Sequence, residues 1–85
     1  MEVKTIAGIP NKGGSNDGNA LNAQFNGPMG ICVDSFGTLF IADSWNNSIR
    51  KLSSNGIIST IREFENLKYP NSVRLDRFGN IWVVD

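Results

Sequence analysis

Acidic residues at the ends of short apolar segments are the side chains best placed to do chemistry in this sequence. Asp34 and Asp76 precede turns, and Asp43 and Asp85 close the apolar segments that follow. Carboxylates gathered in this way can act as general acids and bases or as metal ligands. However, the two pairs have the same spacing in two stretches of the chain, which favours a structural role at strand ends. We therefore predict no catalytic residue and no metal ligand.

The composition removes several other kinds of site. The 85 residues include no His, so His-based general bases, Ser–His and Cys–His nucleophile pairs and His-ligated zinc or haem are excluded from this chain. The single cysteine, Cys32, cannot form an internal disulfide, and its place between Ile31 and Val33 predicts a buried, inert thiol. Eight basic residues balance eight acidic ones, which argues against a dominant basic patch. No cofactor is expected.

Two polar segments carry the candidate binding residues. Trp45, followed by Asn46 and Asn47, places a large aromatic side chain in a loop between two apolar segments. The ring can serve as an exposed anchor for a partner or fold down over its neighbours, and both interpretations stay open. Asp17 lies in a stretch rich in Asn and Asp whose spacing differs from that of a calcium loop, which favours a turn-rich connection. These four residues are the predicted binding residues.

Short β-type segments must position these side chains. No window of eleven or more residues has apolar positions at helical spacing without an interrupting Gly or Pro, so the chain is predicted to be all-β. Seven strands are expected, at residues 3–6, 30–34, 38–43, 48–52, 57–61, 72–76 and 80–85. The second and third are almost wholly apolar, as in strands that are covered on both faces.

The breaks between these segments carry specific turn chemistry. Residues 34–37 (Asp-Ser-Phe-Gly) and 76–79 (Asp-Arg-Phe-Gly) each place an Asp before a Gly. The Asp can accept hydrogen bonds from nearby backbone amides, and the Gly can take a positive φ. Residues 54–56 (Ser-Asn-Gly) form a third turn signal. Residues 30–61 are therefore expected to fold into a four-stranded antiparallel meander.

An internal repeat links these elements. Residues 28–43 align with residues 70–85 without a gap, and Pro, the turn Asp, Phe-Gly and the final Asp coincide. Two chance hairpins with similar turns would not bring the Pro and the final Asp into register. A period of about 40 residues with four strands in each repeat is the signature of a β-propeller blade.

Residues 23–61 closely resemble an NHL repeat, a propeller unit with the pattern Pro, Gly-Ile-x-Val-Asp, a turn with Gly, Ala-Asp and Asn-x-Ile-Arg-Lys. The matching residues are Pro28, Gly30, Ile31, Val33, Asp34, Gly37, Ala42, Asp43, Asn47, Ile49, Arg50, Lys51 and Gly56. The second copy departs from the pattern at Ser72 and Val84. Asp43 is expected to brace its loop by pairing with Arg50, and Gly30 to permit a close approach of neighbouring blades.

The resemblance implies one partial NHL-type propeller made of four-stranded antiparallel blades, incomplete at about seven strands. Residues 1–25 would hold the outer strand of a preceding blade plus a connecting loop. Residues 26–66 would form a complete blade, and residues 67–85 the first two strands of the next. Because closed propellers have four to eight blades, we expect a segment of a longer chain that packs against further blades of the same chain.

The predicted function is a non-catalytic scaffold that binds a protein or another macromolecule. By analogy with other propellers, binding would occur on the loop face, at residues 8–27 and 44–48. The alternative is a segment of a propeller enzyme of the lyase or hydrolase type whose catalytic residues lie on other blades. Nucleic-acid binding is known in the family, but the Lys and Arg residues are scattered here. No apolar run is long enough to span a membrane, and the sequence indicates no compartment.

Overall fold

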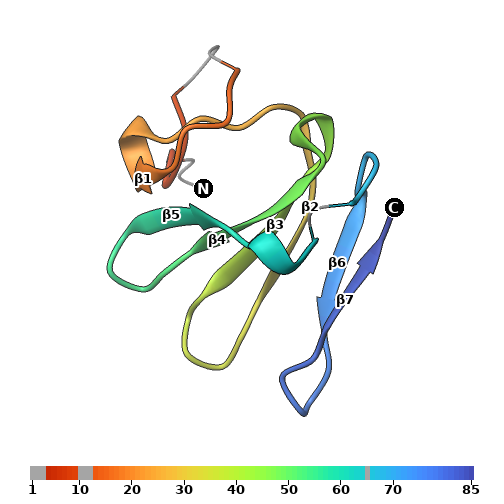
Figure 1. Ribbon diagram of the computed structural model, residues 1–85. Helices are drawn as coiled ribbons and strands as arrows, with labels where there is room; N and C mark the ends of the chain where they lie inside the picture. Colours follow the sequence, from red (N-terminus) through yellow and green to blue (C-terminus); the bar gives the residue numbers. More distant parts are fainter. Residues whose placement is uncertain (1–3, 10–12, 65) are drawn as a thin grey trace.

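The computed structural model describes residues 4–9, 13–64 and 66–85, which form two antiparallel sheets (Figure 1). The first sheet has the order β1-β5-β4-β3-β2, and the second pairs β6 with β7. The strands are β1 (Gly18–Asn19), β2 (Pro28–Val33), β3 (Leu39–Asp43), β4 (Ser48–Leu52), β5 (Ile57–Thr60), β6 (Ser72–Leu75) and β7 (Ile81–Val84). Three single-turn 3-10 helices are η1 (Ala20–Asn22), η2 (Ser44–Asn46) and η3 (Arg62–Phe64). The all-β prediction and the four-stranded meander from β2 to β5 are confirmed.

The expected first strand is the element that the sequence places wrongly. Residues 4–6 are not in a strand, and Val3 lies outside the described residues. A strand exists through backbone hydrogen bonds to a neighbour, and in the described part of the chain residues 4–6 pair with none. The outermost strand is β1 instead, in which Gly18 pairs with Ile58 of β5. The short β1 lies within the segment that was expected to be only a connection.

The two repeated turns at 34–38 and 76–80 form as their chemistry predicts. Asp34 Oδ1 accepts hydrogen bonds from the backbone N–H groups of Phe36 and Thr38, both at 2.9 Å. Asp76 repeats both bonds, at the same length, with the residues two and four positions further along. The glycine three positions after each aspartate has a φ of 85° or 84°, which a residue with a Cβ adopts only with strain.

The hydrophobic core lies on both sides of the first sheet. On one side, residues of β3 and β4 pack against Val73 of the second sheet, and on the other, β4 and β5 pack against the long segment that leads into β2. The buried apolar residues of these two layers are Phe40, Ala42, Ile49 and Val73 in one, and Ala23, Leu52 and Ile58 in the other. The first sheet is therefore sandwiched, as a propeller blade is between its neighbours.

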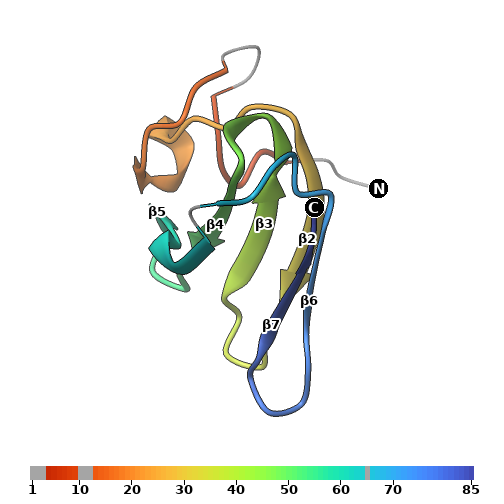
Figure 2. The same cartoon turned by 45° about the vertical axis from the view of Figure 1, so that its right-hand side comes forward.

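The two sheets approach each other most closely where β2 lies beside β6 (Figure 2). A Cβ atom added at Gly30 would lie 2.9 Å from the Asn71 carbonyl oxygen and 3.3 Å from the Ser72 Cα atom. Gly30 does not have a positive φ, so the close approach is the reason that glycine fits here. The expectation that Gly30 permits close contact between blades is confirmed.

The expected burial holds for β3 but not for β2. β3 is buried at four of its five positions, as expected for a strand covered on both faces. In β2, Met29, Ile31 and Val33 are more than half exposed. The reason is that β2 ends the first sheet and the second sheet covers only one of its faces.

Candidate functional site

The loop face lies at the end of the first sheet where β3 turns into β4 through η2 (Figure 1). The segment that leads into β2 crosses the same end of the sheet. Asn47 closes the turn in the left-handed conformation, with φ of 51°, and its N–H donates to the Ser44 carbonyl oxygen at 3.1 Å. Asn tolerates this conformation better than most residues that carry a Cβ. Trp45 and Asn46 are thereby held in a single 3-10 turn at the tip.

A buried arginine holds the crossing segment on the sheet. The Arg50 side chain is only 1% exposed and forms salt bridges with Asp43 at 2.8 Å and with Asp17 at 2.9 Å. Its guanidinium group also donates to the carbonyl oxygens of Gln24 at 2.6 Å and Asn16 at 3.0 Å. We call this set of contacts the Arg50 clasp. The expected pairing of Asp43 with Arg50 is confirmed.

The Asp43 carboxylate completes the clasp from the opposite side. It is fully buried, and its Oδ1 atom accepts a hydrogen bond from the Asn26 backbone N–H at 2.8 Å. Its Oδ2 atom accepts from Arg50 and from the Asn46 side-chain amide, the latter at 2.7 Å. Because both oxygens are hydrogen-bonded, this buried carboxylate acts as a structural anchor.

Two of the four predicted binding residues contact the clasp: Asp17 bonds to Arg50, and Asn46 bonds to Asp43. Asp17 bonds to Arg50 and to the Thr60 hydroxyl, at 3.0 Å from its Oδ1 atom. The Asn46 amide donates to the Gly14 carbonyl oxygen at 2.6 Å as well as to Asp43. Both side chains thus make hydrogen bonds within the chain that position the loop face.

Trp45 lies at the surface of the loop face and is 67% exposed. Its backbone N–H donates to the Asn26 carbonyl oxygen at 3.0 Å, and a Cβ atom at Gly27 would overlap the indole ring. The ring also meets Tyr69 edge to face, with centroids 6.4 Å apart and an interplanar angle of 75°. The ring therefore lies against its neighbours, as in the folded-down arrangement, and also stays largely open to solvent, as an exposed residue does.

Tyr69 is the residue of this face that the sequence analysis missed. It is 61% exposed and has a φ of 48°, and its backbone N–H donates to the Asn47 side chain at 2.8 Å. A signal was present in the repeat: Tyr69 stands directly before Pro70, where Gly27 with φ of 62° stands before Pro28. The contact of Asn47 with Tyr69 joins the turn of the first sheet to the segment that leads into β6.

Two titratable groups outside the loop face have shifted pKa values. Partial burial raises the pKa of the Cys32 thiol, with a smaller opposing effect from Arg74, which supports the expected inert thiol. Hydrogen bonds from Trp82 and then from Asn80 lower the pKa of Asp76 to about 2.

In the described ranges, no three His, Cys, Asp or Glu residues are grouped so that they could hold a metal ion. Those ranges also include no helix with the length and apolar character needed to cross a membrane.

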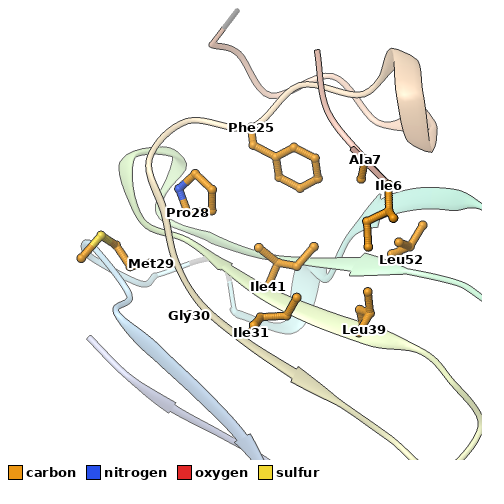
Figure 3. Close-up of a pocket in the computed structure, with 10 residues that line it drawn as sticks. All are labelled: Ile6, Ala7, Phe25, Pro28, Met29, Gly30, Ile31, Leu39, Ile41 and Leu52. Atoms are coloured by element: carbon orange, nitrogen blue, oxygen red, sulfur yellow. The ribbon is translucent and has the colours of Figure 1, made fainter. Parts of the chain in front are cut away.

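An apolar groove of about 390 Å³ lies on the face of the first sheet that points away from the second sheet (Figure 3). Side chains of β2, β3 and β4 form its floor, and Phe25 and Ala7 stand over them. Its lining residues are Ile6, Ala7, Phe25, Pro28, Met29, Gly30, Ile31, Leu39, Ile41 and Leu52. Among the residues that the structure describes, none with a charged side chain lines this groove.

Comparison with known families agrees with this architecture. Residues 7–81 match the family model of the Teneurin NHL domain, so the chain belongs to the NHL-repeat family and is a segment of an NHL-type propeller. It is also 36% identical, over 99% of its length, to the mouse (Mus musculus) protein named NHL repeat-containing protein 3. The chain spans about a quarter of that relative, 26% of its length. The resemblance stated from the sequence is confirmed.

Proposed function

We propose that this chain is a non-catalytic binding scaffold whose loop face contacts a protein partner around Trp45. The observation that carries the proposal is the exposed Trp45–Tyr69 pair at the surface of a tightly held loop face. Trp and Tyr are enriched among the residues that contribute most to protein–protein binding. An exposed pair of this kind offers apolar area and hydrogen-bonding groups in the same place.

The contacts beneath Trp45 support this role because they fix the ring before a partner arrives. The Asn47 N–H holds the turn, the Arg50 clasp holds the crossing segment, and the indole lies against Gly27. A side chain that is ordered in the free protein loses less conformational entropy when it binds. The loop face therefore has the properties of a rigid recognition surface.

The apolar groove supports a second part of the proposal, in which the first sheet packs against a further blade of a longer propeller. By the repeat, Ile31 and Ile41 of the groove correspond to Val73 and Val83 of the second sheet. Val73 and Val83 pack against the first sheet in the core. Ile31 and Ile41 are thus suited to pack against a further blade in the same way.

The Trp45→Ala variant tests the loop-face role. Its matched control is Phe36→Ala, since Phe36 is an aromatic residue with 84% exposure in the turn at the opposite end of the first sheet. Each tagged variant would be used to capture proteins from cell extract, with quantification by mass spectrometry and melting followed by circular dichroism. We expect a protein retained by the wild type and the Phe36 variant to be lost with Trp45→Ala, at an unchanged melting temperature. A large loss of stability with unchanged capture would refute the anchor role, and captured RNA would indicate nucleic-acid binding instead.

A further inference from the structure

A groove of about 590 Å³ lies between the turns at 34–38 and 76–80, at the end of the first sheet opposite the loop face (Figure 2). We call it the turn groove. It is formed by the β2–β3 and β6–β7 hairpins, which the structure describes from end to end. Its volume lies within the range of pockets that bind organic ligands. The turn groove is therefore large enough to receive side chains of a partner.

The turn groove has an apolar floor and an aromatic rim. Phe40, Leu75 and Ile81 on its floor are part of the core layer between the two sheets, so the groove is the open end of that layer. Each turn adds a phenylalanine to the rim, Phe36 at 84% exposure and Phe78 at 76%. Exposed aromatic rings beside an apolar hollow are typical of surfaces that bind a partner.

The two phenylalanine rings differ in what covers them. The Arg77 guanidinium group lies over the Phe78 ring, 5.0 Å from its centroid, in a cation–π contact. In the first copy, Ser35 stands at the position of Arg77. Among the described residues, no cationic side chain lies over the Phe36 ring. This ring is therefore open to a cation from another molecule.

The two turn carboxylates differ in the same way. Asp76 accepts hydrogen bonds on both oxygens, and its Oδ2 atom receives one from the Asn80 side chain at 2.9 Å and one from Trp82 at 3.0 Å. Asp34 accepts its two backbone hydrogen bonds on Oδ1. Within the described part of the chain, no side chain donates to Asp34 Oδ2, so this oxygen can accept a hydrogen bond from a ligand.

We propose that the turn groove binds an extended peptide segment of a partner protein, in which an arginine lies two positions from an apolar residue. The guanidinium group stacks on Phe36 and donates to Asp34 Oδ2, and the apolar side chain enters the groove over Phe40. Side chains two positions apart in an extended peptide point to the same side. Charge complementarity selects this occupant, because the peptide supplies the cation and the donor that the second turn has and the first lacks. Arginine suits the site better than lysine, since a planar guanidinium can stack and donate at once.

A peptide of sequence Gly-Leu-Ser-Arg-Gly, with a fluorescein group at its amino end and an amide at its carboxyl end, tests the proposal by fluorescence anisotropy. NMR spectra locate the site, and we expect shifted signals at Phe36, Phe40 and Ile81. Replacement of the peptide's arginine by glutamine should weaken binding at least about tenfold, and replacement by lysine should weaken it less. Replacement of its leucine by serine should also weaken binding, because the apolar contact is lost.

Ser35→Arg places the chain's own cation on the first turn, as Arg77 does on the second. It should weaken peptide binding at least about tenfold, because its guanidinium group covers Phe36 and pairs with Asp34. Ser54→Arg is the matched control, since Ser54 is exposed in the turn between β4 and β5 and does not line the groove. It should change the affinity less than about twofold at physiological salt.

Asp34→Asn tests the carboxylate alone. The Asn side chain keeps an oxygen for the two backbone hydrogen bonds of the turn but has no charge. We expect binding to weaken at least about tenfold, and the glutamine peptide to lose little more on this variant than on the wild type, because both changes remove the same interaction. Melting followed by circular dichroism shows whether the variant keeps its fold.

The turn groove and the Trp45 surface lie at opposite ends of the first sheet, and neither proposal depends on the other. Phe36→Ala should release the peptide and leave the loop face intact. Equal affinity of the wild type and Ser35→Arg would overturn the role of the first turn. Equal affinity of the arginine and glutamine peptides would contradict the choice of occupant. NMR shifts confined to the loop face, or no binding at about 1 mM peptide, would overturn the turn groove as a peptide site.

Discussion

The two copies of the repeat, residues 28–43 and 70–85, are alike at their turns and unlike at their loop ends. Asp34 and Asp76 each accept the same two backbone hydrogen bonds at 2.9 Å. At the other end, Asp43 is fully buried with three kinds of donor around it, whereas Asp85 is exposed and accepts from one backbone donor among the described residues. The turn is formed by residues within the turn. The loop end is formed only when partners distant in the sequence arrive, so its stability depends on tertiary contacts.

A substitution that breaks the Arg50 clasp should lower the free energy of unfolding more than any other change at the two copies. Arg50→Met removes the cation but leaves Asp43 buried, and a buried charge without its partner costs about 3–5 kcal/mol. We expect the free energy of unfolding, measured by urea titration, to fall by that amount. In a domain this small the loss is large enough to remove most of the folded population at room temperature.

Arg74→Met is the matched control, because Arg74 lies in a strand of the second copy but is exposed. Its replacement should change the free energy of unfolding by no more than about 0.5 kcal/mol. Equal effects of the two substitutions would show that the buried clasp does not hold the loop end.

Gly30→Ala should have a smaller effect, at the contact between the two copies. The added Cβ would meet the Asn71 carbonyl oxygen at 2.9 Å, so β2 and β6 must separate. Overpacking of this kind costs about 1–3 kcal/mol, measurable as a lower urea midpoint. Ser72→Ala changes the corresponding position of the second copy, which already carries a Cβ, and should cost less than about 1 kcal/mol. A neutral Gly30→Ala would mean that the sheets can shift apart freely.

The features that follow from neighbouring residues could be predicted from the sequence, and those that depend on distant residues could not. The turn at Asp34, the β2–β5 meander and the repeat all arise from local patterns. The pairing of Asp43 with Arg50 was predicted because β3 and β4 are adjacent. Asp17 could not be assigned to Arg50, because 33 positions separate them and only the folded crossing segment brings them together.

The first strand and the loop face illustrate the same limit. Residues 4–6 have strand-like composition, yet pairing decides whether a strand forms, and Gly18 and Asn19 pair with β5 instead. The Trp45–Tyr69 contact likewise depends on a positive φ at Tyr69, a conformation that a Tyr residue rarely adopts. Nothing in the local sequence of Tyr69 indicates that conformation, although its alignment with Gly27 does.

The smallest expected effect concerns a difference between the two turns. Trp82 stands where the first copy has Phe40, and its indole N–H donates to Asp76 Oδ2 at 3.0 Å. This bond, followed by one from the Asn80 side chain, holds the pKa of Asp76 at about 2 instead of 3.8. A pKa lowered by folding gives stability that is present above pH 3.8 and lost as the pH falls towards 2.

Trp82→Phe, which restores the residue of the first copy, should raise the pKa of Asp76 and weaken this acid dependence. The pKa follows from NMR titration of the Asp76 carboxyl carbon, and the acid dependence from urea unfolding at pH 5, 3 and 2. Trp45→Phe, at the loop face, should leave both unchanged. An Asp76 pKa that stays near 2 in Trp82→Phe would assign the shift to the Asn80 side chain and the backbone hydrogen bonds of the turn instead.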